Sequence, residues 1–166
     1  MRRGGIYIFV QDNMIYLSQI LDAYVKDSSD TYIGKIKDVL VNTQEGQYPP
    51  LGFLFLQTPK KESMYIPYRY VENLGKEGVT LTHIFKNISR EILPPPGYIF
   101  LKRDALDQQI VDVEGARVVR VNDIGLGFLE DRMSALGLDI SLRGLLRRLG
   151  LGSMHGFGLL KINLID

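Results

Sequence analysis

Six aspartates are the residues whose type and spacing could do chemistry in this chain of 166 residues. They fall into three pairs, each separated by 85 residues: Asp22 and Asp107, Asp27 and Asp112, and Asp38 and Asp123. Carboxylate oxygens are the ligands that magnesium and calcium prefer in proteins. A divalent-cation site that uses Asp27, Asp112 and Asp123 is therefore one interpretation of the pairs.

Turn and cap chemistry is the simpler interpretation of the same aspartates. Their side chains accept hydrogen bonds from backbone N–H groups in tight turns, and a fold that repeats would repeat such turns. The spacing of a calcium-binding loop is absent from the sequence. We therefore expect no metal site and keep cation binding as the alternative.

The other residue types that commonly carry chemistry form no recognisable motif. His83 and His155 are the only histidines and the chain has no cysteine, which argues against a zinc site. The pair Gly150 and Gly152 lacks the third glycine of a dinucleotide-binding loop, and no Gly-x-Ser-x-Gly marks a nucleophile. The sequence therefore predicts a protein that is not an enzyme and uses no cofactor.

Three arginines near the C-terminus are candidates for docking a partner. The spacing predicts a helix over residues 141–149, with four leucines on one face and Arg143, Arg147 and Arg148 mostly opposite. A solvated helix face is the ordinary interpretation. Docking to an acidic partner domain or to anionic lipid is the functional one.

Tyrosines suggest a second kind of contact surface. The chain has nine of them, including Tyr65, Tyr68 and Tyr70. Tyrosine is enriched at interfaces because one end of its side chain is apolar and the other polar. Packing in the wall of a small β-structure is the simpler explanation.

An internal repeat supplies the elements that must position these residues. Residues 16–41 and 101–126 align without a gap at the constant shift of 85. Each copy predicts a short helical turn, a strand, an acidic turn and a longer strand. A repeat of this kind means one supersecondary unit used twice.

Short strands continue after the first copy and after the second. Apolar or alternating runs predict strands over 51–56, 64–68 and 78–82 after the first copy, over 116–124 within the second copy, and over 128–130 and 133–139 at and beyond its end. Close spacing with glycine and polar turns indicates small barrels or sandwiches. Three successive prolines at 94–96 cannot join a ladder. We therefore expect a first unit over 1–92, a Pro-rich connection over 93–97 and a second unit over 98–166.

The apolar positions of these strands predict the core. The expected core residues are Leu21, Val25, Ile33, Ile36, Val39, Leu54, Ile66, Leu106, Ile110, Val118, Val121 and Ile124.

Composition narrows the class of protein. Twenty basic and nineteen acidic residues give a net charge of +1, which argues against binding nucleic acid through a broad basic face. No apolar run approaches the length of a membrane span, and the one at residues 6–10 is too short for a signal peptide. Together with the absence of cysteine, this favours a cytoplasmic protein.

The second copy carries a resemblance to a known family. Residues 101–121 read LKRDALDQQIVDVEGARVVRV and resemble the PRC-barrel family of small β-barrels. Residues 17–41 show the same pattern in a more diverged form. The resemblance implies a mainly β fold with two tandem PRC-type barrels and one short helix near the C-terminus. A ribosome-maturation factor shares this fold, but work on RNA would need a basic stripe that the sequence lacks.

A finer resemblance suggests a biological setting. Residues 107–123 together with 142–149 are similar to the cytosolic N-terminal region of bacterial MgtE-like, magnesium-transporter-related proteins. There, PRC-type units precede a helical domain and CBS domains, neither of which occurs in this chain. The resemblance implies a non-catalytic interaction or regulatory module. Its expected partners are other domains of the same or a partner protein, or further copies of itself, and it would reach a membrane only through a partner.

Overall fold

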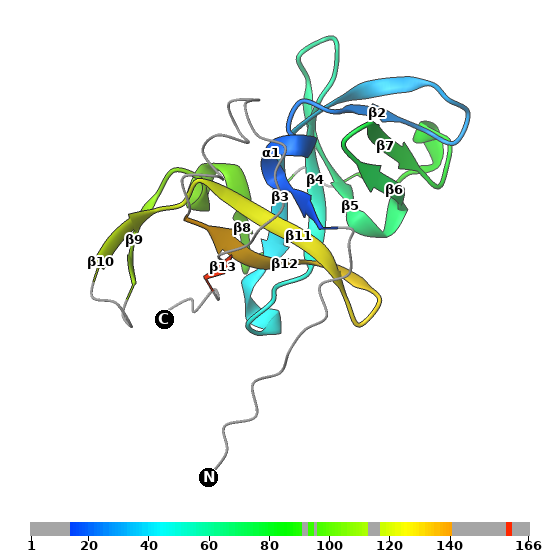
Figure 1. Cartoon of the computed structure of the whole chain (residues 1–166). Coiled ribbons are helices and arrows are strands. Elements are labelled where there is room, and N and C mark those ends of the chain that lie inside the picture. Colours follow the sequence, from blue (N-terminus) through cyan, green and yellow to red (C-terminus); the bar gives the residue numbers. More distant parts are fainter. Residues whose placement is uncertain (1–13, 91–92, 95, 113–116, 141–158, 161–166) are drawn as a thin grey trace.

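The computed structural model describes residues 14–90, 93–94, 96–112, 117–140 and 159–160, and it confirms a mainly β protein (Figure 1). The strands are β1 (Ile15–Tyr16), β2 (Tyr24–Lys26), β3 (Tyr32–Asn42), β4 (Leu51–Gln57), β5 (Ser63–Pro67), β6 (Val71–Gly75), β7 (Gly78–Leu81), β8 (Tyr98–Phe100), β9 (Gln109–Asp112), β10 (Arg117–Arg120), β11 (Asp123–Leu129), β12 (Arg132–Asp139) and β13 (Leu159–Leu160). The helical turns are α1 (Leu17–Ile20), η1 (Thr43–Glu45), η2 (Tyr68–Tyr70), η3 (Phe85–Asn87) and η4 (Leu101–Ala105). We call residues 14–90 the first half and the described residues from 96 onward the second half.

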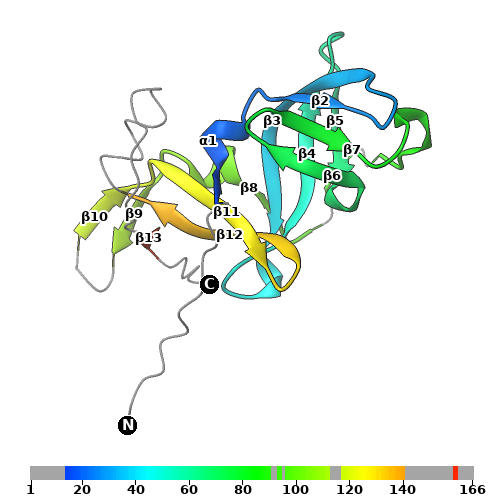
Figure 2. The same cartoon turned by 45° about the vertical axis from the view of Figure 1, so that its right-hand side comes forward.

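Two sheets and one ribbon make up the molecule. The larger sheet has the strand order β5-β4-β3-β2-β7-β6, with β8 also paired to β3. The smaller sheet has the order β1-β11-β12-β13, and β9 pairs with β10 alone. In both views the β9–β10 ribbon lies at the opposite end of the molecule from β2, β6 and β7 (Figure 2).

The expected closed barrels are not found among the described strands. The larger sheet has β5 at one edge and β6 at the other, and these two strands do not pair. Strand β5 ends at Pro67, which has no N–H group to donate, and the chain then turns through η2 before β6 begins. The predicted helix over 141–149 lies outside the described residues.

The repeat is confirmed at the residue between the helical turn and the next strand of each copy. Asp22 lies two residues after α1, and Asp107 lies two residues after η4. Both have a left-handed backbone, with φ angles of 63° and 67°. The N–H of Asp22 donates to the carbonyl of Ile36 at 2.8 Å, and the N–H of Asp107 donates to the carbonyl of Val121 at 2.9 Å. All four residues obey the shift of 85.

Strand register repeats as well. Tyr24 lies opposite Lys35 in the β2–β3 pair, and Gln109 lies opposite Arg120 in the β9–β10 pair. Both pairs are related by the same shift. The repeat therefore fixes which residues face each other, and not only which elements form.

The long strand of the repeat differs between the copies. In the first half, β3 runs unbroken over eleven residues, whereas in the second half the chain leaves β10 after Arg120 and enters β11 at Asp123. The expected single strand over 116–124 is therefore wrong. Strand β11 extends to Leu129, and the turn into β12 is made by Glu130 and Asp131, both with positive φ, as in a type I′ hairpin.

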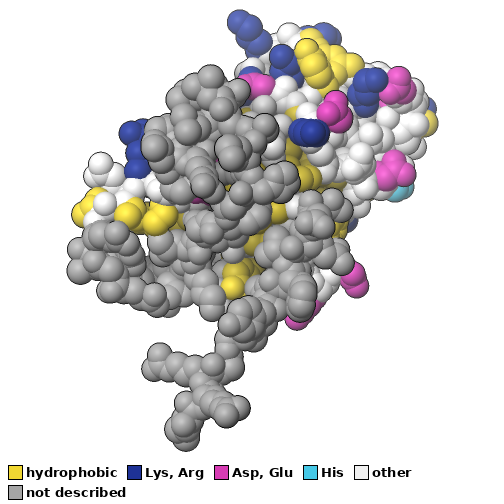
Figure 3. Space-filling view, viewed as in Figure 1, with side chains coloured by type: hydrophobic (Ala, Val, Ile, Leu, Met, Phe, Trp, Pro, Cys, Tyr) yellow, Lys and Arg dark blue, Asp and Glu magenta, His cyan; other side chains and the backbone are white. Residues whose placement is uncertain are grey.

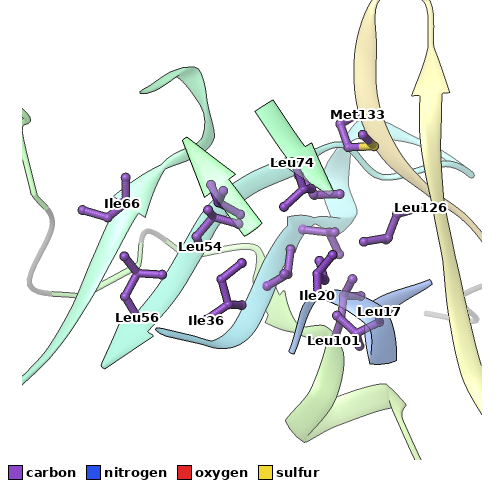
Figure 4. Close-up of a cluster of buried hydrophobic side chains, with 14 of the residues drawn as sticks. Leu17, Ile20, Ile36, Leu54, Leu56, Ile66, Leu74, Leu101, Leu126 and Met133 are labelled. Atoms are coloured by element: carbon purple, nitrogen blue, oxygen red, sulfur yellow. The ribbon is translucent and has the colours of Figure 1, made fainter. Parts of the chain in front are cut away.

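One hydrophobic core draws on both halves. Figure 4 shows side chains of the first half, such as Ile20 and Ile36, packed with Leu101 and Leu126 of the second. Nine expected core residues are buried: Val25, Ile33, Ile36, Val39, Leu54, Ile66, Leu106, Val121 and Ile124. Leu21 and Ile110 are partly buried against the same core.

Val118 is the exception among the expected core residues. Its side chain is 67% exposed. It lies on β10, which pairs only with β9 in the described part of the chain. An apolar residue of the repeat is buried only where further strands cover its face.

Candidate interaction site

Asp27 holds a turn together. Its Oδ1 accepts hydrogen bonds from the N–H groups of Ser29 and Thr31 at 2.9 and 3.0 Å, and from the Ser29 hydroxyl at 2.7 Å. Its Oδ2 accepts from the N–H of Phe85 at 2.9 Å. These donors, the Phe85 N–H first, lower the pKa of Asp27 to about 2. The carboxylate thus ties the β2–β3 turn to η3.

Asp38 and Asp123 cap helical turns across the molecule. Asp38, on β3, accepts from the N–H groups of Lys102 and Arg103 at 2.7 and 3.1 Å, at the start of η4. Asp123, on β11, accepts from the N–H and the hydroxyl of Ser18 in α1 at 3.1 and 2.6 Å. Ser18 and Arg103 are themselves related by the shift of 85. Each half therefore caps the helical turn of the other.

Burial and hydrogen bonding act against each other at Asp38. Its side chain is 4% exposed, and this desolvation raises its pKa above the ordinary value. The N–H groups of Lys102, Val39 and Arg103 act in the opposite direction because they stabilise the carboxylate. Asp38 is thus a buried charge held by backbone donors.

Strand pairing between the halves follows the same exchange. β1 of the first half pairs with β11 of the second, with Ile15 opposite Leu126. β8 of the second half pairs with β3 of the first, with Ile99 opposite Val41. The expected boundary at 93–97 stays a prediction, and these contacts cross it.

The remaining acidic pair forms exposed ion pairs. Asp22 pairs with Lys37, and Asp107 pairs with Arg120 at 3.0 Å. The side chain of Asp112 lies outside the described residues. Within the described part of the chain, no three Asp, Glu or His side chains form a group that could hold a metal ion.

Two other sets of predicted site residues have different outcomes. Arg143, Arg147 and Arg148 lie outside the described residues, as does His155, so the docking helix stays a prediction. His83 is exposed, and its Nδ1 lies 2.7 Å from the Thr82 hydroxyl. On the part of the face in Figure 3 that the described residues form, Lys and Arg side chains are interspersed with Asp and Glu.

A groove between the halves is the feature that the motifs did not reveal. It has a volume of about 370 Å³ and lies between the β4–β5–η2 region and the β11–β12 hairpin. Its lining is rich in aromatic and proline side chains with charged groups among them: Asn42, Glu45, Pro50, Leu51, Gly52, Pro67, Tyr68, Arg69, Tyr98, Phe128, Asp131, Arg132 and Met133. Of the tyrosines singled out from the sequence, only Tyr68 lines it.

Local contacts explain why the groove forms. The Tyr98 ring lies against Gly52, where an added Cβ would come within 2.1 Å of the ring, so only glycine fits. The hairpin is held to the first half by the Ala135 N–H, which donates to the Pro49 carbonyl at 2.9 Å. Arg132 and Glu45 add an ion pair at 2.6 Å between the same two regions.

Charged groups of both signs line the groove. They are Arg69 and Arg132 with Glu45 and Asp131, so the formal charges of the lining balance. Burial raises the pKa of the Tyr68 hydroxyl to about 12, which keeps it neutral. Phe128, which also lines the groove, is 67% exposed. Aromatic side chains are enriched at protein interfaces relative to the rest of the surface.

Fold and groove together define a class: a mainly β protein made from a duplicated unit whose copies exchange strands and caps. Residues 12–86 match the model of the PRC-barrel domain family. The match lies in the first half, whereas the sequence places the stronger resemblance in the second. No curated protein matches the chain. Among the described residues, no helix has the length and apolarity needed to cross a membrane.

Proposed function

We propose that the protein is a non-catalytic interaction module whose docking surface is the groove between its halves. The groove lining combines an exposed Phe128 with the buried apolar side chains of Leu51 and Met133, and this is the observation that carries the proposal. An aromatic anchor beside a partly buried pocket is a common hot spot of protein interfaces. The balanced charges of the rim suit a neutral or mixed-charge protein surface better than a polyanion.

The finer setting of this module rests on resemblance alone. The similarity of residues 107–123 and 142–149 to MgtE-like proteins supports a role in the cytosolic N-terminal part of a magnesium-transporter-related protein. The partner would then be a domain of the same or an associated protein. In that setting Arg143, Arg147 and Arg148 form a second docking surface.

Two equally exposed side chains allow a matched test of the groove. Phe128 in the groove and Val118 on the β9–β10 ribbon are both 67% exposed. A photo-crosslinking amino acid at either position, used in cells of the source organism, reports what contacts each surface. We expect one recurrent protein product at position 128 that is absent at 118. Equal yields at the two positions, or no product at 128, would overturn the proposal.

Binding of the purified product supplies the quantitative step. We expect Phe128→Ser to weaken its affinity at least tenfold, which is the range of a hot-spot residue. Val118→Ser should leave the affinity unchanged. Equal effects of both substitutions would mean that the contact is not specific to the groove.

A further inference from the structure

Aromatic side chains from three separate elements line the groove. Tyr68 comes from η2, Tyr98 from β8 and Phe128 from β11. Among the described residues the Tyr68 hydroxyl has no hydrogen-bond partner, and its raised pKa leaves it a proton to donate. The groove therefore combines aromatic surface with a partly buried donor whose acceptor must come from a ligand or from water.

Two prolines in the lining narrow the form that a ligand can take. Pro67 ends β5, which is an edge strand of the larger sheet, and proline has no N–H group to donate to an added strand. Pro50 has none either, and it already lies opposite Ser134 in an isolated bridge. Strand addition is therefore unfavourable here. The volume of about 370 Å³ is near the lower limit for ligand pockets, so it suits a few residues of a peptide.

We propose that the groove binds a proline-rich segment of its partner in the polyproline II conformation, an inference that rests on the proposed docking function. Such a segment makes no internal hydrogen bonds, so its carbonyl groups are free to accept from Tyr68. Its prolines carry no N–H groups, so few donors lose their partners beside Pro50 and Pro67. Aromatic-lined grooves are the usual receptors of this conformation.

The charged side chains of the lining refine the sequence of the ligand. Arg132 and Glu45 pair with each other at 2.6 Å. Arg69 lies over the Tyr70 ring, 4.9 Å from its centroid. Asp131 forms no ion pair within the described part of the chain, so its carboxylate is available to a cation. We therefore expect lysine or arginine beside the prolines of the ligand.

A peptide array tests the proposal on the full chain. It carries peptides of about ten residues with two prolines fixed as Pro-x-x-Pro, beside a matched array in which both prolines are alanine. We expect binding to the proline array to be at least about tenfold stronger, with lysine or arginine enriched beside the prolines. The mirror-image form of the strongest peptide adopts a helix of opposite hand. Fluorescence anisotropy should show that it binds at least about tenfold more weakly.

Matched substitutions place the binding in the groove. Tyr68→Phe removes only a hydroxyl from the lining, and Tyr70→Phe removes the same group from η2 outside it. We expect the first to weaken the affinity for the strongest peptide about two- to tenfold, the range of one hydrogen bond, and the second to leave it unchanged. Asp131→Asn should abolish the preference for a basic residue. Glu130→Gln, in the same turn but outside the lining, should preserve it.

Equal binding to the proline and alanine arrays, or equal binding of the mirror-image peptide, would overturn the proposal. Equal effects of Tyr68→Phe and Tyr70→Phe would do the same. If circular dichroism shows that Tyr68→Phe does not fold, Phe128→Ser takes its place and should weaken peptide binding at least about tenfold. A protein that crosslinks at position 128 but has no proline-rich segment would support the docking function and overturn this inference alone.

Discussion

The β2–β3 pair of the first half and the β9–β10 pair of the second are the same structure in different surroundings. Ile33 and Val118 occupy equivalent positions, yet Ile33 is 7% exposed and Val118 is 67% exposed. β2 is joined by β7, and β3 by β4 and β8, whereas β9 and β10 have only each other among the described strands. The repeat therefore preserves hydrogen-bond geometry, while burial depends on what packs beside it.

The largest expected effect separates these two positions directly. Ile33→Ala removes a buried side chain and should lower the free energy of unfolding by about 2–5 kcal/mol. Val118→Ala removes an exposed one and should change it by less than about 0.5 kcal/mol. Guanidinium unfolding followed by circular dichroism measures both. Comparable losses would mean that the ribbon is covered in solution.

The next effect concerns the two caps. Asp38→Ala leaves the N–H groups of Lys102 and Arg103 without their acceptor and should cost about 1–3 kcal/mol. Asp123→Ala removes the acceptor of Ser18 in the same way and should cost a similar amount. Asp30→Asn removes the charge of an exposed ion pair with Lys26 and keeps a residue that tolerates the left-handed backbone of this position, so it is the control and should cost less than about 1 kcal/mol. If only one of the two cap substitutions lowers the free energy of unfolding, the two caps are not equivalent in energy, contrary to our expectation.

Asp27 tests turn chemistry against cation binding. Its folded pKa, about 2, is below the ordinary 3.8. The carboxylate therefore contributes stability that is fully present above about pH 4 and lost as the pH falls towards 2. We expect Asp27→Asn to flatten the pH dependence of the free energy of unfolding in this window.

Magnesium decides the alternative in the same experiment. A cation held by the folded chain would raise the free energy of unfolding as its concentration increases. We expect no change on adding magnesium or calcium at millimolar concentration, with or without Asp27. Stabilisation that Asp27→Asn or Asp112→Asn abolishes would instead establish a cation site.

Local features of the fold could be predicted from the sequence because they depend on neighbouring residues. The shift of 85 places Asp22 and Asp107 at equivalent turns, and nine expected core residues are buried. The predicted turn role of aspartate applies directly at Asp27, whose Oδ1 accepts hydrogen bonds from the N–H groups of Ser29 and Thr31 within its own turn.

Long-range features could not be predicted in this way. A constant shift states that two copies exist, but not that Asp38 caps the turn of the other copy. The groove depends on contacts of the β11–β12 hairpin with Pro49 and Pro50 of the first half. No local sequence pattern predicts these contacts. The exposure of Val118 likewise depends on the surroundings of its strand: among the described strands, β10 pairs only with β9. The alternation of apolar residues along β10 does not report this.

The smallest expected effect asks why aspartate occurs at 22 and 107. Their ion pairs with Lys37 and Arg120 are exposed and contribute little, whereas both residues have a left-handed backbone that costs most side chains about 1–2 kcal/mol. Asn tolerates this conformation, so Asp22→Asn should be almost neutral, whereas Asp22→Ala should cost about 1 kcal/mol. The same two substitutions at Asp107 should follow the same order, measured by thermal unfolding. If Asn costs as much as Ala at both sites, charge is the reason for the repeated aspartate. If the order holds at 22 and fails at 107, the second copy has been released from the constraint that the first still obeys.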